Sequence, residues 1–127
     1  MKNVTGWLLQ RLLSNDGHQH ATICEFAPGE NIFRVGEPGD YLAVLLAGRV
    51  EIRKGEAVIA AIDPGGLFGE MGIIDGKPRV ADAYAKANSR IAKIKEGQFL
   101  GLLEASPHFG LAVMRLLTDR IRRQIET

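Results

Sequence analysis

The chain has 127 residues, 46% of them hydrophobic, and a formal net charge of +1. This length is enough for one domain with its own core, and the near-neutral charge gives no reason to expect a nucleic-acid or acidic membrane surface. No segment approaches the roughly 20 apolar residues of a membrane-spanning helix, and no signal-peptide cleavage site follows the N-terminal apolar stretch. The single cysteine, Cys24, excludes an internal disulfide, so we expect a cytoplasmic protein with a buried structural thiol.

Two sequence patterns divide the first three quarters of the chain. Trp and Leu side chains recur at helical spacing in residues 4–14, which predicts a short amphipathic helix within an N-terminal segment 1–18. A single domain then covers 19–127, and its larger part has short Val-, Ile- and Ala-rich runs with turn signals about every ten residues, as in antiparallel barrels and sandwiches. The predicted strands are 21–26, 31–35, 41–48, 79–85 and 89–95, with a hairpin over 49–62.

The last third of the chain is predicted to be helical. One helix covers 96–106, and Pro107 suits the first turn of a final helix with Ser106 as its N-cap. An apolar stripe runs along that final helix and consists of Phe109, Val113, Leu116, Leu117, Ile121 and Ile125. Such a stripe packs on the barrel, dimerises or closes over a ligand. The predicted fold is therefore mainly β with flanking helices.

The stretch "LFGEMGIIDG", residues 67–76, does not fit the strand pattern. Gly69 permits a tight turn, residues 70–74 are long enough for one helical turn, and "DG" ends it. A glycine-led turn that opens a short helix presents several backbone N–H groups in a concave array, which suits an anion. A barrel needs no helix here, so the insertion indicates a functional site.

One acid and one base define the chemistry of this insertion. Ionised Glu70 only accepts hydrogen bonds, so it suits a donor such as a sugar hydroxyl. The Arg79 guanidinium binds phosphate oxygens in pairs, and the N–H groups of Val80 and Ala81 extend the anion site. The set predicts a sugar-phosphate pocket. The alternative is that Glu70 and Arg79 form a structural ion pair with each other.

The segment "FGEMGIIDGKPRVA", residues 68–81, resembles the phosphate-binding cassette of the cyclic nucleotide-binding domain, F-G-E-(L/M)-(A/G)-(L/I), a short turn, then P-R-x-A. The upstream "GENIFRVGEPGDYLAVLLAGRVEI" is similar to the family's first strands and turns, and the resemblance extends over about residues 19–126. The family includes catabolite activator proteins, regulatory subunits of protein kinase A and cyclic-nucleotide-gated channels. The resemblance implies an antiparallel β-roll of jelly-roll type with a short phosphate-binding helix, an N-terminal helix and two C-terminal helices.

The resemblance also implies roles for individual residues. Glu70 is expected to accept the ribose 2′-hydroxyl, and Arg79 to bind the exocyclic phosphate oxygens. The implied ligand-binding residues are Phe68, Gly69, Glu70, Met71, Arg79, Val80 and Ala81 in the cassette, with Ile52 and Ile59 beside the purine. The implied lid residues on the final helix are Arg120, Arg123 and Gln124.

Two positions depart from the family pattern. Members that prefer cyclic GMP often carry Ser or Thr directly after the arginine, where this chain has Val80, so we expect cyclic AMP and, less favourably, cyclic GMP as the ligand. Asp82 stands where threonine is common. Strand alternation places its carboxylate on the face opposite Arg79. No cofactor is expected beside the nucleotide.

Other classes of function fit less well. His18, His20 and Glu25 loosely resemble the first cupin metal motif, but the second motif is absent, so no metal site is predicted. An enzyme that hydrolyses phosphodiesters would need a metal cluster or a positioned base beside a nucleophile. No helix-turn-helix follows the final helix, so direct nucleic-acid binding is not expected.

The predicted function is that of a stand-alone sensor domain that signals by repositioning its C-terminal helix. Its expected partners are a cyclic nucleotide and an effector protein of unknown identity, with homodimerisation through that helix as a further option and no membrane partner. The alternative is a degenerate barrel that serves as an interaction module and no longer binds nucleotide. Glu70 and Arg79 argue against this alternative, whereas Asp82 favours it.

Overall fold

The structure is a computed structural model that describes residues 21–126. These residues belong to two compact units, one formed by residues 21–96 and one whose described part is 97–126. The first unit contains β1 (Thr22–Phe26), β2 (Asn31–Phe33), β3 (Tyr41–Ala47), β4 (Val50–Lys54), β5 (Ala57–Ile62), β6 (Leu67–Phe68), α2 (Glu70–Asp75), β7 (Asp82–Ala85) and β8 (Ser89–Lys95). The predicted helix 4–14 and the domain boundary after residue 18 lie outside the described residues.

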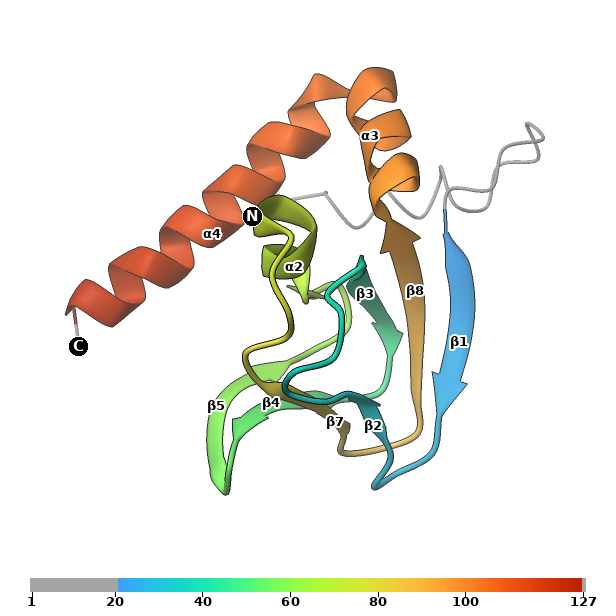
Figure 1. The fold of residues 1–127 in the computed structure, drawn as a ribbon, viewed down its shortest axis with the longest axis vertical. Helices are drawn as coiled ribbons and strands as arrows, with labels where there is room; N and C mark the ends of the chain where they lie inside the picture. The colour runs from blue at the N-terminus through green and yellow to red at the C-terminus, as the bar shows by residue number, and fades with distance from the viewer. Residues whose placement is uncertain (1–20, 127) are drawn as a thin grey trace. The chain divides into compact units, whose positions relative to one another are not determined.

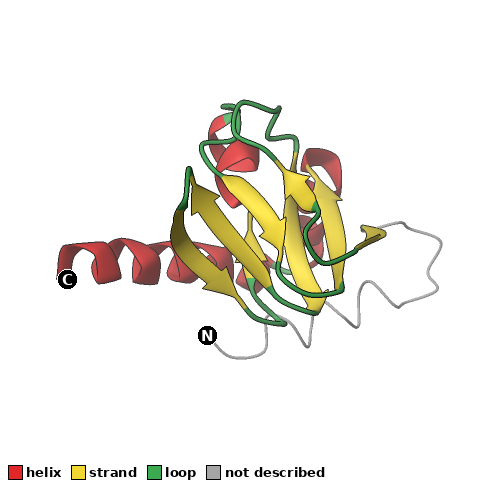
Figure 2. Cartoon of the chain, turned by 90° about the horizontal axis from the view of Figure 1, so that it is seen from below, coloured by secondary structure: helices red, strands yellow, loops and turns green. Residues whose placement is uncertain are grey.

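The strands of the first unit form two antiparallel four-stranded sheets (Figures 1 and 2). One has the order β1-β8-β3-β6 and the other β2-β7-β4-β5. In the second sheet β4 is central, and it pairs with β5 in the predicted hairpin and with β7 on its other side. The prediction of a mainly β roll with flanking helices is therefore confirmed.

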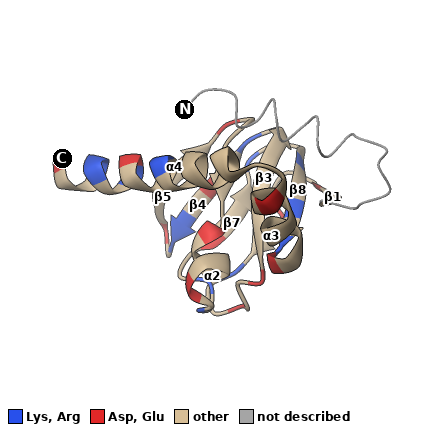
Figure 3. Cartoon of the chain, turned by 90° about the horizontal axis from the view of Figure 1, so that it is seen from above, with Lys and Arg blue, Asp and Glu red and all other residues tan. Residues whose placement is uncertain are grey.

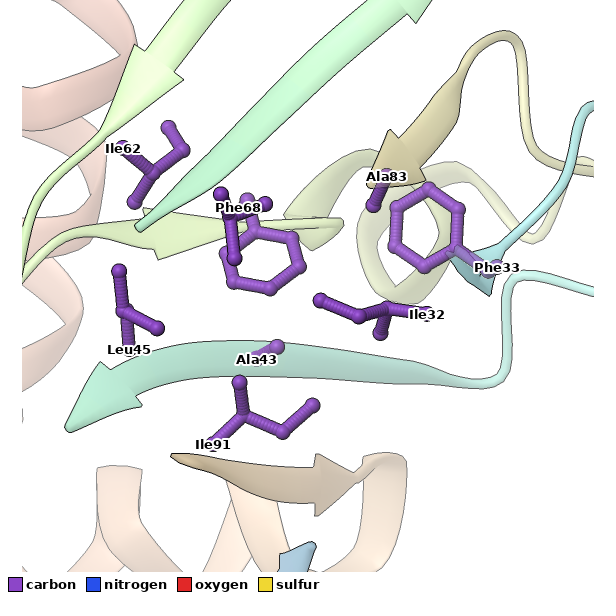
Figure 4. Close-up of a cluster of buried hydrophobic side chains, with 9 residues drawn as sticks. Ile32, Phe33, Ala43, Leu45, Ile62, Phe68, Ala83 and Ile91 are labelled. Carbon is purple, nitrogen blue, oxygen red and sulfur yellow. The ribbon is translucent and has the colours of Figure 1, made fainter. Parts of the chain in front are cut away.

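A hydrophobic core lies between the inner faces of the two sheets. Phe68, Leu45 and Ile62 point toward one another there (Figure 4). The full cluster consists of Ile32, Phe33, Ala43, Leu45, Val50, Ile62, Phe68, Ala83 and Ile91. Cys24 of β1 packs against this cluster but is only half-buried, so the predicted burial of its thiol is incomplete. Alternation directs Ala43 and Leu45 of β3 inward, as expected for a strand in a sheet with one apolar face, whereas the consecutive Ile32 and Phe33 of β2 are both buried.

The helices begin and end where the local sequence predicts. Gly69 and Gly76 flank α2 in the left-handed conformation, with φ of 75° and 70°, and the Gly76 N–H donates to the Gly72 carbonyl at 2.9 Å. Glycine adopts this conformation without steric cost, which explains why α2 stops after six residues.

The second unit contains α3 (Glu96–Ala105), apart from its first residue, and α4 (Pro107–Glu126). The rings of Phe99 and Phe109 meet edge to face across the junction of the two helices, with 5.6 Å between their centroids. Phe109 and Val113 of the predicted stripe are buried, whereas Ile121 and Ile125 are exposed. Basic and acidic segments share the C-terminal half of α4 (Figure 3). Among the helices that the structure describes, none combines the length and the apolar character required to cross a membrane.

Two expectations about the strands are wrong. The short strand β6 falls within the predicted insertion, where it pairs with Ala43 and Val44 of β3. The strand predicted to begin at Arg79 begins three residues later, at Asp82. The reason is that the Arg79 backbone pairs with the loop between β2 and β3. The Gly36 N–H donates to the Arg79 carbonyl, and the Arg79 N–H donates to the Glu37 carbonyl, both at 2.8 Å.

Candidate functional site

The loop of residues 34–40, between β2 and β3, packs backbone against backbone on α2. A Cβ added at Gly39 would lie 2.8 Å from the Gly72 Cα and 2.9 Å from the Lys77 carbonyl oxygen. Only glycine at both positions allows this approach, because any side chain would separate the loop from the helix. Gly39 and Gly72 therefore allow the loop that leads into β3 to lie directly against the cassette helix.

Arg79 is buried, with 6% of its surface exposed, and its guanidinium is held by two backbone carbonyls. Nη1 donates to the Gly69 carbonyl at 2.7 Å, and Nη2 donates to the Tyr41 carbonyl at 2.6 Å. The first acceptor lies at the start of α2 and the second at the start of β3. The side chain thus links two segments that are far apart in the sequence, and the two carbonyls fix the orientation of its guanidinium.

The third nitrogen of the guanidinium is the site's most informative atom. Arg79 Nε is buried and has no hydrogen-bond partner among the described residues. Burial lowers the pKa of Arg79, while Tyr41, Asp40 and Glu70 act in the opposite direction. A buried donor without an acceptor costs on the order of 1–3 kcal/mol. An anionic ligand whose oxygen reaches Nε would remove that cost.

Glu70 is the first residue of α2 and is also buried, with 3% of its surface exposed. Its position in the first turn suits the positive end of the helix dipole. Its charge opposes the effect of burial on the pKa of Arg79, although several other groups act more strongly. The guanidinium hydrogen bonds described above go to carbonyls, and the structural ion pair between Glu70 and Arg79 stays an alternative.

The residues after Arg79 differ in how they are held. Val80 is exposed, Ala81 is buried, and neither N–H makes a backbone hydrogen bond within the described part of the chain. Asp82 accepts a hydrogen bond from the Val35 N–H at 2.8 Å. The carboxylate is thus bound to the loop of residues 34–40. Strand alternation predicts that the Asp82 carboxylate lies opposite Arg79, but Arg79 lies outside β7, so alternation does not relate the two side chains. The hydrogen bond from the Val35 N–H orients the Asp82 carboxylate instead.

The other predicted ligand-binding residues lie in different environments. Phe68 is 2% exposed and belongs to the core, whereas Met71 on α2 is exposed. Ile52 on β4 is half-buried and lies opposite Ala83 of β7. Ile59 is exposed and occupies the register shift at which Ile52 pairs with Ala60 and Arg53 with Val58. A purine contact for Ile52 and Ile59 stays a prediction.

The predicted lid residues Arg120, Arg123 and Gln124 lie on α4, in the second unit. Their contact with a nucleotide also stays a prediction. Of the metal motif, His18 and His20 lie outside the described residues. Within residues 21–126, no three His, Cys, Asp or Glu side chains come together as a metal site.

The sequence does not indicate Tyr41 and Phe33, whose side chains or backbone contact the Arg79 guanidinium. Tyr41 supplies a carbonyl, and its ring centroid lies 4.7 Å from the Arg79 Cζ. The Phe33 ring centroid lies 4.0 Å from the same atom. Each lies in a predicted strand, and nothing in the local pattern of either residue indicates contact with a distant arginine.

Comparison with known proteins agrees with this geometry. The family model of the cyclic nucleotide-binding domain matches residues 23–106. A CRP-like cAMP-activated global transcriptional regulator of Mycobacterium tuberculosis is 28% identical over 104 residues, which is 78% of this chain and 46% of that protein. A cyclic nucleotide-gated potassium channel of Mesorhizobium japonicum is 34% identical over 92 residues, which is 72% of this chain and 25% of the channel.

A solved structure shares the fold. The catabolite activator protein of Thermus thermophilus superposes with a TM-score of 0.77 at 26% identity, over 83% of this chain and 52% of that one. The chain thus spans about half the length of these two bacterial regulators. The match of the family model covers most of the β unit, the whole cassette and α3. The chain belongs to the cyclic nucleotide-binding domain family.

Proposed function

We propose that this domain binds cyclic AMP at the cassette and acts as a regulatory sensor rather than as an enzyme. The observation that carries the proposal is the buried Arg79 Nε, which lacks an acceptor in the part of the chain that the structure describes, while two carbonyls orient the rest of the guanidinium. An exocyclic phosphate oxygen of the nucleotide would accept from Nε, and the backbone N–H groups of Val80 and Ala81 would contribute further donors. Glu70, buried at the start of α2, would accept the ribose 2′-hydroxyl.

The preference for cyclic AMP over cyclic GMP rests on Val80. This residue follows the phosphate-binding arginine and has no hydroxyl to donate to a guanine. A cAMP-activated regulator among the relatives supports the same choice. The expected order of affinity is therefore cyclic AMP, then cyclic GMP, with 5′-AMP weaker still because its phosphate is not closed into a ring.

We further propose that binding is passed on through α4, with Arg120, Arg123 and Gln124 as the lid. A ligand that contacts α4 in only one arrangement would shift its equilibrium by roughly 1–3 kcal/mol. Hydrogen exchange of α4 amides, with and without cyclic AMP, tests this step. Unchanged exchange at saturating ligand would contradict the signalling proposal while leaving the binding proposal intact.

Calorimetric titration of the full chain with cyclic AMP and cyclic GMP tests the binding proposal. Arg79→Ala is expected to weaken cyclic AMP binding by about 2–5 kcal/mol, because a buried phosphate charge loses its partner. Glu70→Gln is expected to cost less, since an amide oxygen still accepts. Arg49→Ala is the matched control, because Arg49 is an exposed arginine whose ion pair with Asp63 lies outside the cassette.

The outcomes separate the two candidate roles. Retained affinity in Arg79→Ala refutes the phosphate assignment. A wild-type protein that binds neither nucleotide favours the degenerate interaction module instead.

A further inference from the structure

The Arg79 guanidinium lies against two aromatic rings. Its Cζ is 4.0 Å from the Phe33 ring centroid and 4.7 Å from the Tyr41 ring centroid. The two rings meet edge to face, with centroids 6.3 Å apart and an interplanar angle of 71°. Phe33 is held in turn by Phe68, at 6.1 Å between ring centroids. Arg79 therefore sits in a corner formed by Phe33 and Tyr41, which we call the aromatic corner.

The aromatic corner stabilises the positive charge of the buried guanidinium, which the two carbonyls compensate only in part. A buried guanidinium loses its hydration, and here two carbonyls satisfy only part of its donor capacity while Nε has no acceptor among residues 21–126. The negative faces of aromatic rings attract such a cation, most strongly where water is excluded. Without the rings, the long Arg79 side chain would gain freedom and hydration by leaving the site.

The two ring residues are themselves restrained. Phe33 is 7% exposed and belongs to the core cluster. The Tyr41 hydroxyl donates to the Ile32 carbonyl at 3.4 Å, and Lys93 Nζ lies 4.6 Å from the Tyr41 ring centroid. Tyr41 also supplies the carbonyl that accepts from Arg79 Nη2. The rings are therefore fixed by their own surroundings, and not by Arg79 alone.

We propose that Phe33 and Tyr41 are positioning residues, which hold the Arg79 guanidinium in place for the phosphate before the nucleotide arrives. This inference rests on the proposed function, in which Arg79 binds that phosphate. A preformed guanidinium avoids the loss of side-chain freedom on binding, so the aromatic corner raises affinity without touching the ligand. Neither residue belongs to the cassette motif, and neither needs to contact the nucleotide.

The test compares ring-deleted variants of the full chain by calorimetry with cyclic AMP. Phe33→Leu and Tyr41→Leu are each expected to raise the Kd by about 5- to 30-fold, the range that corresponds to a partly or fully desolvated cation–π contact. Tyr41→Phe keeps the ring and is expected to stay near the wild-type Kd. Tyr84→Leu is the matched control, because the Tyr84 ring stacks on Arg53 with 3.7 Å between centroid and Cζ, away from Arg79.

A spectroscopic readout separates positioning from general damage to the fold. The Arg79 Nε–H proton should resonate upfield in the free protein, because the adjoining Cζ lies over two aromatic rings, 4.0 and 4.7 Å from their centroids. The upfield shift should be reduced in Tyr41→Leu and in Phe33→Leu, and retained in Tyr41→Phe and in Tyr84→Leu. If Tyr41→Leu does not fold, the wild-type resonance and Phe33→Leu decide the question.

The outcomes distinguish this inference from the proposed function. If the wild type binds cyclic AMP and both folded leucine variants bind equally well, the positioning role is overturned and the phosphate role of Arg79 stands. If the wild type does not bind, the proposed function fails, and the Nε–H resonance alone tests the aromatic corner. An unshifted resonance overturns the placement of the guanidinium, and an upfield one that is reduced in the leucine variants supports it.

Discussion

Replacing Gly72 by Ala tests the close approach between α2 and the loop of residues 34–40. A Cβ at position 72 would lie 2.6 Å from the Gly39 Cα and closer still to the Gly39 carbonyl oxygen. Ordinary contact begins at 3.4 Å, so either the loop or the helix must move. The same loop holds the Arg79 backbone through Gly36 and Glu37, so the displacement would reach the guanidinium.

The expected magnitude is a difference between two opposing effects. Forcing an extra methyl group into a packed contact costs about 1–3 kcal/mol, and the upper end applies because the obstacle is backbone rather than a flexible side chain. Ala in place of Gly in a helix recovers about 1 kcal/mol. We therefore expect Gly72→Ala to lower the free energy of unfolding by about 2 kcal/mol and to weaken cyclic AMP binding.

Urea denaturation followed by circular dichroism measures this change. Gly101→Ala is the matched control, because Gly101 lies inside α3 and a Cβ there meets nothing within 4 Å. That substitution should stabilise the protein by up to about 1 kcal/mol through helix propensity alone. A Gly72→Ala midpoint equal to or above that of the wild type, at an unchanged m value, would refute the close approach of the loop to α2.

Three further substitutions separate core, surface and charge effects. Phe68→Ala should cost about 3–5 kcal/mol in urea denaturation, because the ring is 2% exposed in the core. Ile59→Ala should change stability by less than about 0.5 kcal/mol yet weaken cyclic AMP binding, and unchanged binding would remove Ile59 from the purine site. Hydrogen bonding from Arg53 lowers the pKa of Glu51, so the loss of stability in Glu51→Gln should be complete above about pH 4.5, and the melting temperatures of variant and wild type should converge as the pH falls through the lowered pKa.

The cassette could be predicted from the sequence because its signals act over a few residues. Gly69 and Gly76 set the left-handed backbone at either end of α2, and both effects need only the glycine itself. The β4–β5 hairpin follows from alternation and a glycine turn in the same way. Local rules of this kind also indicated that Glu70 and Arg79 belong to one site.

Tertiary packing decided the remainder. Arg79 and its acceptor Tyr41 are 38 positions apart, and Asp82 is 47 positions from Val35, so no short window of sequence contains either pair. The late start of β7 has the same origin, since loop 34–40 occupies the hydrogen bonds of Arg79 that a strand partner would need. The sequence by itself determined the turns and the short helix of the cassette, because these depend on glycines and periodicities that act locally, and it predicts which residues bind the ligand. Only the folded chain decided what surrounds the arginine, because burial and aromatic contact arise when distant segments pack together.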